Sequence, residues 1–298
     1  MKTVTYELKL ITPCFCAGAN QEIAEIRAPS IRGKLRWWFR VVGGNDAEES
    51  EIFGSIAGDG GVGSAVIVRV REHTVAARWQ PIPFTGISNT GYILYFAKAS
   101  AGGARWRPTG ALPVGSSFEL QLLWRRKVSP AAQTRFDLAL DAFLLLGSLG
   151  LRSTRGLGCF QCKELPFSAD SFHRTIQRVK QGSQGFLAEL GSFSGPETKI
   201  LDGLGAQLRG LRNGYSAGPP GRPKSTPLGS SQPRQSSAVY LRPVQEGPIS
   251  YRIVVFEAPP ERVLGRESRQ NAPLLRTGVP PPGAAPQGTR GGLGGPRR

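Results

Sequence analysis

The chain has 298 residues, and its 38 lysines and arginines against 21 aspartates and glutamates give a formal net charge of +17. So positive a charge exceeds what solubility needs and favours a polyanionic partner, most simply a nucleic acid. No apolar run is long enough to span a bilayer, and the N-terminus has no signal-peptide pattern, so we expect a cytoplasmic protein. A membrane surface is disfavoured as partner, because the sequence has neither a long basic amphipathic helix nor a lipidation motif.

The first predicted elements are a strand and a short basic helix. Residues 4–11 alternate polar and apolar side chains, which predicts a strand ending at Pro13. After a long polar connection, Pro29 and Ser30 mark the start of a helix, with Ser30 as the expected N-cap, and Gly43 marks its end.

This helix has an apolar stripe and a basic stripe. At 100° per residue the apolar stripe, expected to face the core, comprises Ile31, Leu35, Trp38 and Val42, with Phe39 on its flank. The second stripe contains Arg32, Arg36 and Arg40. Like charges one turn apart weaken a helix slightly, so the basic row indicates either an anionic partner or pairing with carboxylates elsewhere in the chain.

The rest of the first half continues the alternation of strands and helices. An acidic patch at 46–51 follows the basic helix, and we expect strands at 65–70, 118–124 and 159–164, a shorter strand candidate at 92–97, and a buried helix at 136–149. This order is that of a ferredoxin-like (RRM-like) βαββαβ domain, in which the last strand lies antiparallel beside the first. The fold class is therefore α+β. The topology also places the glycine-rich residues 150–158 beside the start of the basic helix, where N–H groups favour an anion.

The second half gives weaker patterns. Residues 172–190 are compatible with one or two helices, 203–221 with a loop, and 238–242 and 250–257 with strands, which together predict a reduced second α+β domain. From residue 259, proline, glycine and arginine dominate without periodicity, so we expect a disordered basic tail. The predicted units are 1–165, 166–258 and 259–298.

The glycine-rich segment is a candidate phosphate cradle. It lacks the Gly-Lys-Ser/Thr ending of a nucleotide-binding loop and does not follow a strand, so nucleoside triphosphate binding is disfavoured. Glycines let the main chain approach a phosphate closely, and Arg152 and Arg155 supply charge. The alternative is an ordinary helix-to-strand turn with solvated arginines. Trp37 is expected to stand exposed beside the basic row, where it would stack a base or fill a subunit interface.

The spacing of the four cysteines does not favour a zinc site. Cys14 and Cys16 are expected near Cys159 and Cys162, but the last two would project to opposite faces of a strand and no histidine supports the cluster. We therefore expect buried free thiols.

Catalytic candidates are few. His73 and His173 are the only histidines, and neither belongs to a motif with a paired nucleophile, although a metal-independent ribonuclease could use one. Asp137 and Asp141 lie one turn apart, where a solvated helix face is more probable than a metal site.

Motifs of the RAMP superfamily of CRISPR effector subunits resemble three segments of this chain, PSIRGKLRWWFR at 29–40, IFGS at 52–55 and RSTRGLG at 152–158. Within that superfamily the chain is similar to the subfamily that forms the first subunit of type III-B Cmr complexes. The similarity covers about residues 4–165, and residues 228–257 show a weaker similarity. The C-terminal half departs from the family pattern, and the tail has no counterpart in it.

The resemblance implies two ferredoxin-like domains, no metal or organic cofactor and no small-molecule substrate. It implies a non-catalytic role in antiviral defence, at the end of the complex that holds the 3′ part of the guide RNA, in contact with guide or target RNA and other RAMP subunits. The candidate RNA-binding residues are Arg32, Gly33, Lys34, Arg36, Trp37, Trp38 and Arg40 in the helix, and Arg152, Ser153, Thr154, Arg155, Gly156, Leu157 and Gly158 in the loop. Two alternatives remain: a RAMP-type endoribonuclease that processes guide precursors, and a mainly protein-binding scaffold.

Overall fold

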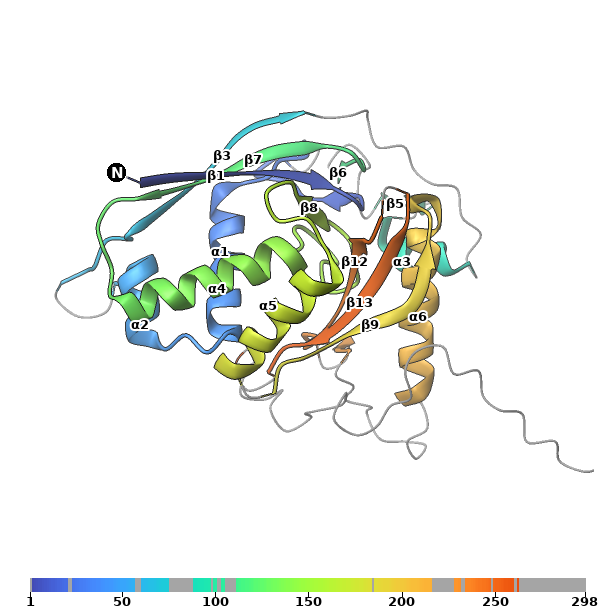
Figure 1. Ribbon diagram of the computed structural model, residues 1–298. Coiled ribbons are helices and arrows are strands. Elements are labelled where there is room, and N and C mark those ends of the chain that lie inside the picture. The colour runs from blue at the N-terminus through green and yellow to red at the C-terminus, as the bar shows by residue number, and fades with distance from the viewer. Residues whose placement is uncertain are drawn as a thin grey trace, which may run out of the picture.

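The structure is a computed structural model that describes residues 2–20, 23–56, 60–74, 88–97, 99–100, 103–104, 111–183, 185–215, 228–231, 234–247, 249–259 and 262 (Figure 1). The expected C-terminal tail lies outside the described residues, apart from Pro259 and Arg262.

A four-stranded sheet organises the first half of the chain. Its strands are β1 (Lys2–Leu10), β3 (Val66–Thr74), β7 (Ser117–Trp124) and β8 (Phe160–Cys162). They lie in the order β3-β7-β1-β8, and every neighbouring pair is antiparallel. The last strand therefore lies beside the first, as expected from the sequence, and the α+β class is confirmed.

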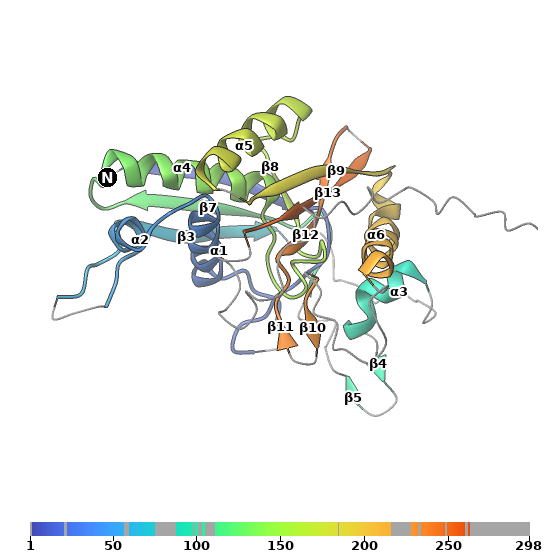
Figure 2. The ribbon, with the colours of Figure 1, turned by 90° about the horizontal axis from the view of Figure 1, so that it is seen from below.

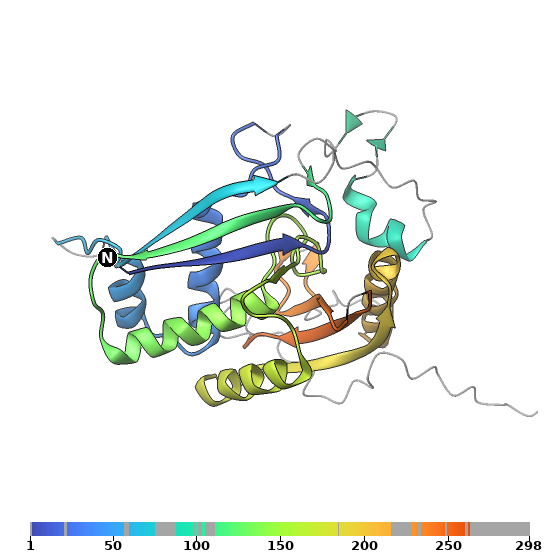
Figure 3. The same cartoon turned by 45° about the horizontal axis from the view of Figure 1, so that its top comes forward.

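Helices cover one face of this sheet. The helices α1 (Ala28–Val41), α2 (Asp46–Phe53) and α4 (Pro130–Leu146) lie on the same side of the strands (Figure 1). Leu8 and Leu10 of β1 point toward the helices and are buried, whereas Glu7 and Lys9 alternate with them and are exposed. The strands β3, β7 and β1 lie side by side when the sheet is seen from above (Figure 3).

A second, three-stranded antiparallel sheet follows. It has the order β12-β13-β9 and consists of β12 (Val239–Gln245), β13 (Tyr251–Glu257) and β9 (Leu187–Gly195). The helix α5 (Ala169–Gly182) packs beside α4, and α6 (Ile200–Tyr215) packs beside α3 (Asn89–Leu94) (Figures 2 and 3). The remaining short elements are β2 (Cys14–Phe15), η1 (Tyr95–Ala97), β4 (Ala99–Ser100), β5 (Gly103–Ala104), β6 (Ala111–Leu112), η3 (Glu197–Lys199), β10 (Ser230–Ser231) and β11 (Arg234–Gln235).

Both halves of the chain contribute to both hydrophobic cores. In the larger core, Trp38 of α1 packs against Phe256 of β13, with ring centroids 5.5 Å apart. In the smaller core, Leu157 of the glycine-rich segment lies among α6 and second-sheet residues that include Leu204 and Leu241. This exchange of buried side chains holds the two sheets in one arrangement.

The boundaries of α1 and the acidic patch differ from the prediction. The helix begins at Ala28, with Arg27 as N-cap and without a side-chain cap, so the proposed cap at Ser30 is wrong. Pro29 lies in the first turn, where its missing N–H costs no hydrogen bond. The acidic patch is the helix α2, which begins with a capping box between Asn45 and Glu48. That spacing was visible in the sequence.

Three further predictions from the sequence are corrected. The strand candidate at 92–97 is helical, since Ser88 caps α3 and η1 continues it, and residues 187–190 belong to β9 rather than to a helix. The segment 203–221, expected as a loop because of its glycines, contains most of α6. A Cβ on Gly205 would lie 2.1 Å from the Asn89 carbonyl oxygen. The glycine therefore lowers helix propensity but lets α3 approach α6 closely.

This contact gives a stability prediction. Gly205→Ala should lower the free energy of unfolding by about 1–3 kcal/mol, because the new methyl group meets backbone atoms of α3. Gly210→Ala is the matched control in the same helix, since nothing lies within 4 Å of its Cβ position. It should raise the free energy of unfolding by about 0.5–1 kcal/mol. Urea denaturation measures both, and equal effects would contradict the close approach of α3.

Candidate nucleic-acid interface

The glycine-rich segment Arg152–Gly158 is a tightly turned loop between α4 and β8. Gly156 and Gly158 have φ values of 82° and 65°, and Arg152 has a φ of 58°, which is uncommon for a residue with a side chain. A Cβ on Gly158 would lie 1.9 Å from the Leu149 carbonyl oxygen, so only glycine fits there. The N–H groups of Arg155 and Gly156 donate back to the carbonyl oxygens of Arg152 and Ser153, so these turns are closed by their own hydrogen bonds.

The loop is held between the two halves of the chain. The N–H of Gly158 donates to the carbonyl oxygen of Pro13 at 2.9 Å, and the N–H of Leu241 in β12 donates to that of Thr154 at 3.0 Å. Leu157 is fully buried in the smaller core, and Gly156 lies directly against Leu204 of α6. Ser153, Gly156, Leu157 and Gly158 are therefore largely structural, and Arg152 and Arg155 supply the charge.

Lys34 connects the loop to α1. Its Nζ donates to the Ser153 Oγ at 3.0 Å, so the two basic segments that the sequence suggested would converge do meet. Burial lowers the pKa of Lys34, and the nearby thiols of Cys159 and Cys14 oppose that shift. The ammonium group thus lies beneath the loop as a nearly enclosed positive charge.

The arginines of the basic stripe on α1 bind other residues of the same chain. Arg36 and Arg40 both bind the carboxylate of Glu49 on α2, with Arg40 Nε 2.5 Å from Glu49 Oε2, and Glu49 is only 5% exposed. Arg32 donates to the Phe53 carbonyl oxygen. The alternative of pairing with carboxylates elsewhere therefore applies to Arg36 and Arg40, and two cations on one anion leave a net positive charge.

Both tryptophans of α1 pack against other side chains rather than projecting into solvent. Trp38 is 2% exposed and belongs to the larger core. Trp37, expected to stand exposed, is half-buried, with its ring centroid 5.0 Å from that of Tyr240 in β12. Gly33 is exposed, and nothing lies within 4 Å of its Cβ position. Gly33 therefore leaves the surface of α1 open to solvent, whereas the indole rings join α1 to the second sheet.

Arg152 and Arg155 form the part of the site without compensating negative charge. Burial, together with the charges of Arg212 and Arg152, lowers the pKa of Arg155 to about 10. The guanidinium of Arg152 lies over the ring of Phe96, 5.4 Å from its centroid. Neither arginine forms an ion pair with any described residue. Partly buried like charges without a carboxylate favour an external anion.

The sequence interpretation missed Arg209 and Arg212. Both lie on α6, in the segment expected as a loop, and the charge of Arg212 reaches Arg152 and Arg155. Their spacing of three residues, which puts them on one helix face, would have been informative had the helix been predicted.

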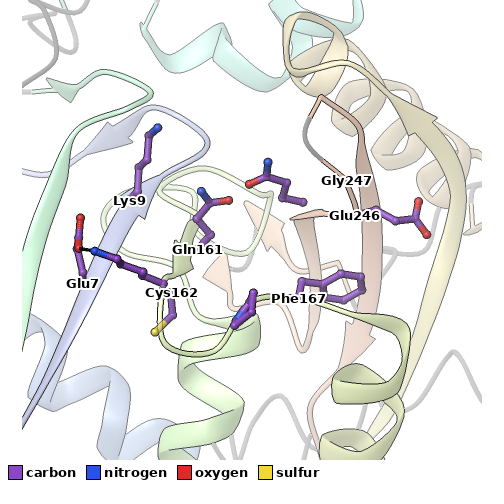
Figure 4. Close-up of a pocket in the computed structure, with 10 residues that line it drawn as sticks. Glu7, Lys9, Gln161, Cys162, Phe167, Glu246 and Gly247 are labelled. Carbon is purple, nitrogen blue, oxygen red and sulfur yellow. Dashed lines mark hydrogen bonds and ion pairs between the residues drawn. The ribbon is translucent and has the colours of Figure 1, made fainter.

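A cavity of about 400 Å³ lies elsewhere, between β8 and the turn joining β12 to β13 (Figure 4). Its walls carry the Glu7–Lys163 ion pair and the carboxylate of Glu246, and none of the candidate RNA-binding residues. Burial and a hydrogen bond to Glu164 raise the pKa of Cys162 to about 12, so its thiol stays protonated. This mixed charge and unreactive thiol do not suit a phosphate backbone.

The remaining candidates do not form a second site. The four cysteines are free thiols, and in the described part of the chain no three metal-binding side chains gather closely enough to hold an ion. His173 is exposed on α5, and Asp141 pairs with Arg178 at 2.9 Å. Asp137 accepts a hydrogen bond from Gln133 on the solvent side of α4. Both carboxylates thus have protein partners.

The loop, the helix motif and the antiparallel sheets agree with one protein class. A sequence profile of the RAMP superfamily matches residues 7–161, just over half of the chain. The chain therefore belongs to the RAMP superfamily.

Its relatives within the superfamily are Cmr1 proteins. The chain is 32% identical over 161 residues to the CRISPR system Cmr subunit Cmr1-1 of Pyrococcus furiosus, covering 52% of this chain and 44% of that protein. It is 28% identical over 188 residues to Cmr1-2 of the same organism, covering 55% of this chain and 97% of that protein. The chain thus spans less than half the length of the first relative.

Solved structures share the fold. The crystal structure of apo Cmr1 from Pyrococcus furiosus superposes with a TM-score of 0.57 at 23% identity, covering 87% of this chain and 89% of that one. A chain of the type III-B Cmr-beta complex bound to cognate target RNA gives a TM-score of 0.50 at 11% identity, covering 86% and 94%. Within the described ranges no helix has the length and apolar character needed to cross a membrane.

The ion pairs of Glu49 with Arg36 and Arg40 give a prediction on stability in acid. Burial raises the pKa of Glu49, but hydrogen bonds from Arg40 and Arg36 outweigh it and hold the pKa below its ordinary value. The pair therefore stabilises the fold above the unfolded-state pKa of about 4.3, and this stabilisation is lost as the pH falls through the folded-state pKa.

Glu49→Gln should lower the free energy of unfolding at pH 7 by about 2 kcal/mol and flatten the loss of stability below pH 5. Glu7→Gln is the matched control, since its pair with Lys163 is exposed and solvent screening leaves it little effect on stability. Denaturant titrations from pH 3 to 7 measure both variants. An unchanged acid profile in Glu49→Gln would refute the role of this pair.

Proposed function

We propose that this chain is a non-catalytic RNA-binding subunit of a type III-B Cmr complex, which holds guide or target RNA near the 3′ end of the guide. The observation that carries the proposal is the pair Arg152 and Arg155, partly buried beside like charges and without an ion-pair partner among the described residues. Phosphate oxygens would supply the missing negative charge, and guanidinium groups bind them in bidentate geometry. The names of the curated relatives, which are complex subunits, support the same assignment.

The proposed RNA path runs over the loop rather than over the sheet. RRM-type domains stack bases on aromatic side chains of their open sheet face. In β1 and β7 the outward positions hold polar or aliphatic side chains, namely Thr3, Thr5, Glu7, Lys9, Ser117, Glu119, Gln121 and Leu123. Since the outward positions of these two central strands carry no stacking ring, backbone contacts at the loop are the proposed source of affinity, and sequence preference should be small.

The proposal includes the domain organisation suggested by the sequence. Residues 1–165 and 166–258 form two ferredoxin-like units, the second one reduced, and 259–298 form a basic tail. Within the first unit, Lys34 and the net charge of Arg36, Arg40 and Glu49 add to the positive potential beside the loop. Other RAMP subunits are the proposed protein partners, and the cytoplasm is the proposed location.

The salt dependence of RNA binding tests the proposal. Arg152→Gln/Arg155→Gln should weaken binding to single-stranded RNA at least tenfold. It should also reduce the slope of log K against log salt by about 1.4, which is about 0.7 for each lost phosphate contact. Arg174→Gln/Arg178→Gln removes the same charge from exposed positions on α5 and is the matched control. Equal slopes in the two double variants would refute the loop as the RNA site.

The non-catalytic assignment has its own test. Labelled CRISPR repeat RNA incubated with the purified protein and a chelator should remain intact, because the exposed His173 of α5 forms no hydrogen bond or ion pair with any described residue that could activate it. Cleavage at a defined position that His73→Ala or His173→Ala abolishes would instead establish the endoribonuclease alternative.

A further inference from the structure

Two arginines of α6 are held in place by a tyrosine of α3. The guanidinium carbons of Arg209 and Arg212 lie 5.0 Å and 5.4 Å from the centroid of the Tyr92 ring. Arg212 donates to the Tyr92 hydroxyl, and Arg209 donates to the Ser88 carbonyl oxygen at 3.1 Å. The two helices lie side by side at the end of the molecule away from α2 (Figures 2 and 3). Both side chains are thus ordered before any ligand binds.

The same helix lies next to the glycine-rich loop. Gly156 packs directly on Leu204, one helical turn before Gln207 and Leu208, and Leu157 shares a core with Leu204, Leu208 and Leu211. The charge of Arg212 consequently acts on both loop arginines. On the other side, Arg152 lies over Phe96 of η1, which directly follows α3. We call Arg152, Arg155, Arg209 and Arg212 the arginine cluster.

The arginine cluster joins segments that are far apart in the sequence. Two members come from the loop of the first half and two from a helix of the second half. Tyr92 of α3 contacts the two helix arginines, and Phe96 of η1 contacts Arg152. Bringing like charges together in a partly buried place is unfavourable, and the aromatic faces offset only part of that cost. In the part of the chain that the structure describes, no carboxylate pairs with the loop arginines to supply the rest.

We infer that Arg212, with Arg209 beside it, completes the phosphate site formed by Arg155 and Arg152, so that one bound RNA strand bridges the two halves of the chain. The inference rests on the proposed RNA-binding function and assigns to that site residues outside the segment that the superfamily profile matches. A phosphodiester backbone fits better than a base, because guanidinium groups already lie over the Phe96 and Tyr92 rings. The site therefore recognises the charged phosphodiester backbone of an RNA strand rather than the identity of its bases.

A double-mutant cycle tests whether Arg155 and Arg212 share a phosphate. The probe is a 20-nucleotide oligouridylate, bound to the full-length chain at fixed salt. Arg155→Gln and Arg212→Gln should each weaken binding about tenfold. The double variant should lose clearly less than the hundredfold product, because the second substitution removes a partner from a phosphate already released.

Matched controls separate this inference from general electrostatics. Arg178→Gln, which removes one charge on α5, should weaken binding less than Arg212→Gln, and its loss should multiply with that of Arg155→Gln. Arg212→Lys, which keeps the charge, should recover part of the affinity. Thermal unfolding of each variant reports whether the chain is folded, and only variants with an unchanged transition enter the cycle.

The outcomes distinguish the two proposals. If Arg155→Gln weakens binding while Arg212→Gln matches Arg178→Gln, the contribution of α6 is refuted and the proposed function stands. Losses of Arg155→Gln and Arg212→Gln that simply multiply would likewise overturn a shared phosphate site. If neither variant weakens binding more than Arg178→Gln, the loop is not the RNA site and the proposed function fails with the inference.

Discussion

The docking of the glycine-rich loop onto α6 is the contact on which the site depends. Leu157 enters the smaller core, Gly156 lies against Leu204, and Thr154 is hydrogen-bonded to Leu241 of β12. These contacts fix the backbone that carries Arg152 and Arg155. The two charges are therefore held in one region of the surface. Glycine is required because a side chain at 156 or 158 would meet Leu204 or the backbone at Leu149.

Positive charge is used in two different ways in this chain. On α1, Glu49 accepts hydrogen bonds from Arg36 and Arg40, and the three side chains join α1 to α2. At the loop, Arg152 lies over the Phe96 ring, and among the described residues no ion pair is found for Arg152 or Arg155. Hydrogen bonds and cation–π contacts orient a guanidinium while its charge remains available. The first arrangement stabilises the fold, and the second leaves a potential that attracts polyanions.

The interleaved cores explain why residues of both halves can act on one ligand. Trp38 of α1 packs against Phe186 and Phe256, so the second sheet is anchored to the helix that carries the family motif. The buried side chain of Arg242 in β12 donates to the Phe160 carbonyl oxygen at the edge of the first sheet. The same packing places Gly156 of the loop directly against Leu204 of α6, so the two halves meet at the loop.

Strong local patterns in the sequence determined the α+β class, the strand order of the first sheet, the amphipathic helix α1 and the convergence of the loop with Lys34. Alternation and helical periodicity are local properties, and the position of the last strand beside the first follows from element order. Tertiary structure alone decided that Trp38 and Trp37 pack against the second sheet, that Glu49 pairs with two arginines, and that a glycine-containing segment becomes α6. Each of these depends on partners far away in the chain, and packing overrides local propensity when a close helix contact, as at Gly205, requires a residue without a side chain. The arginines of α6 belong to the site for the same reason, since only the fold places them beside the loop.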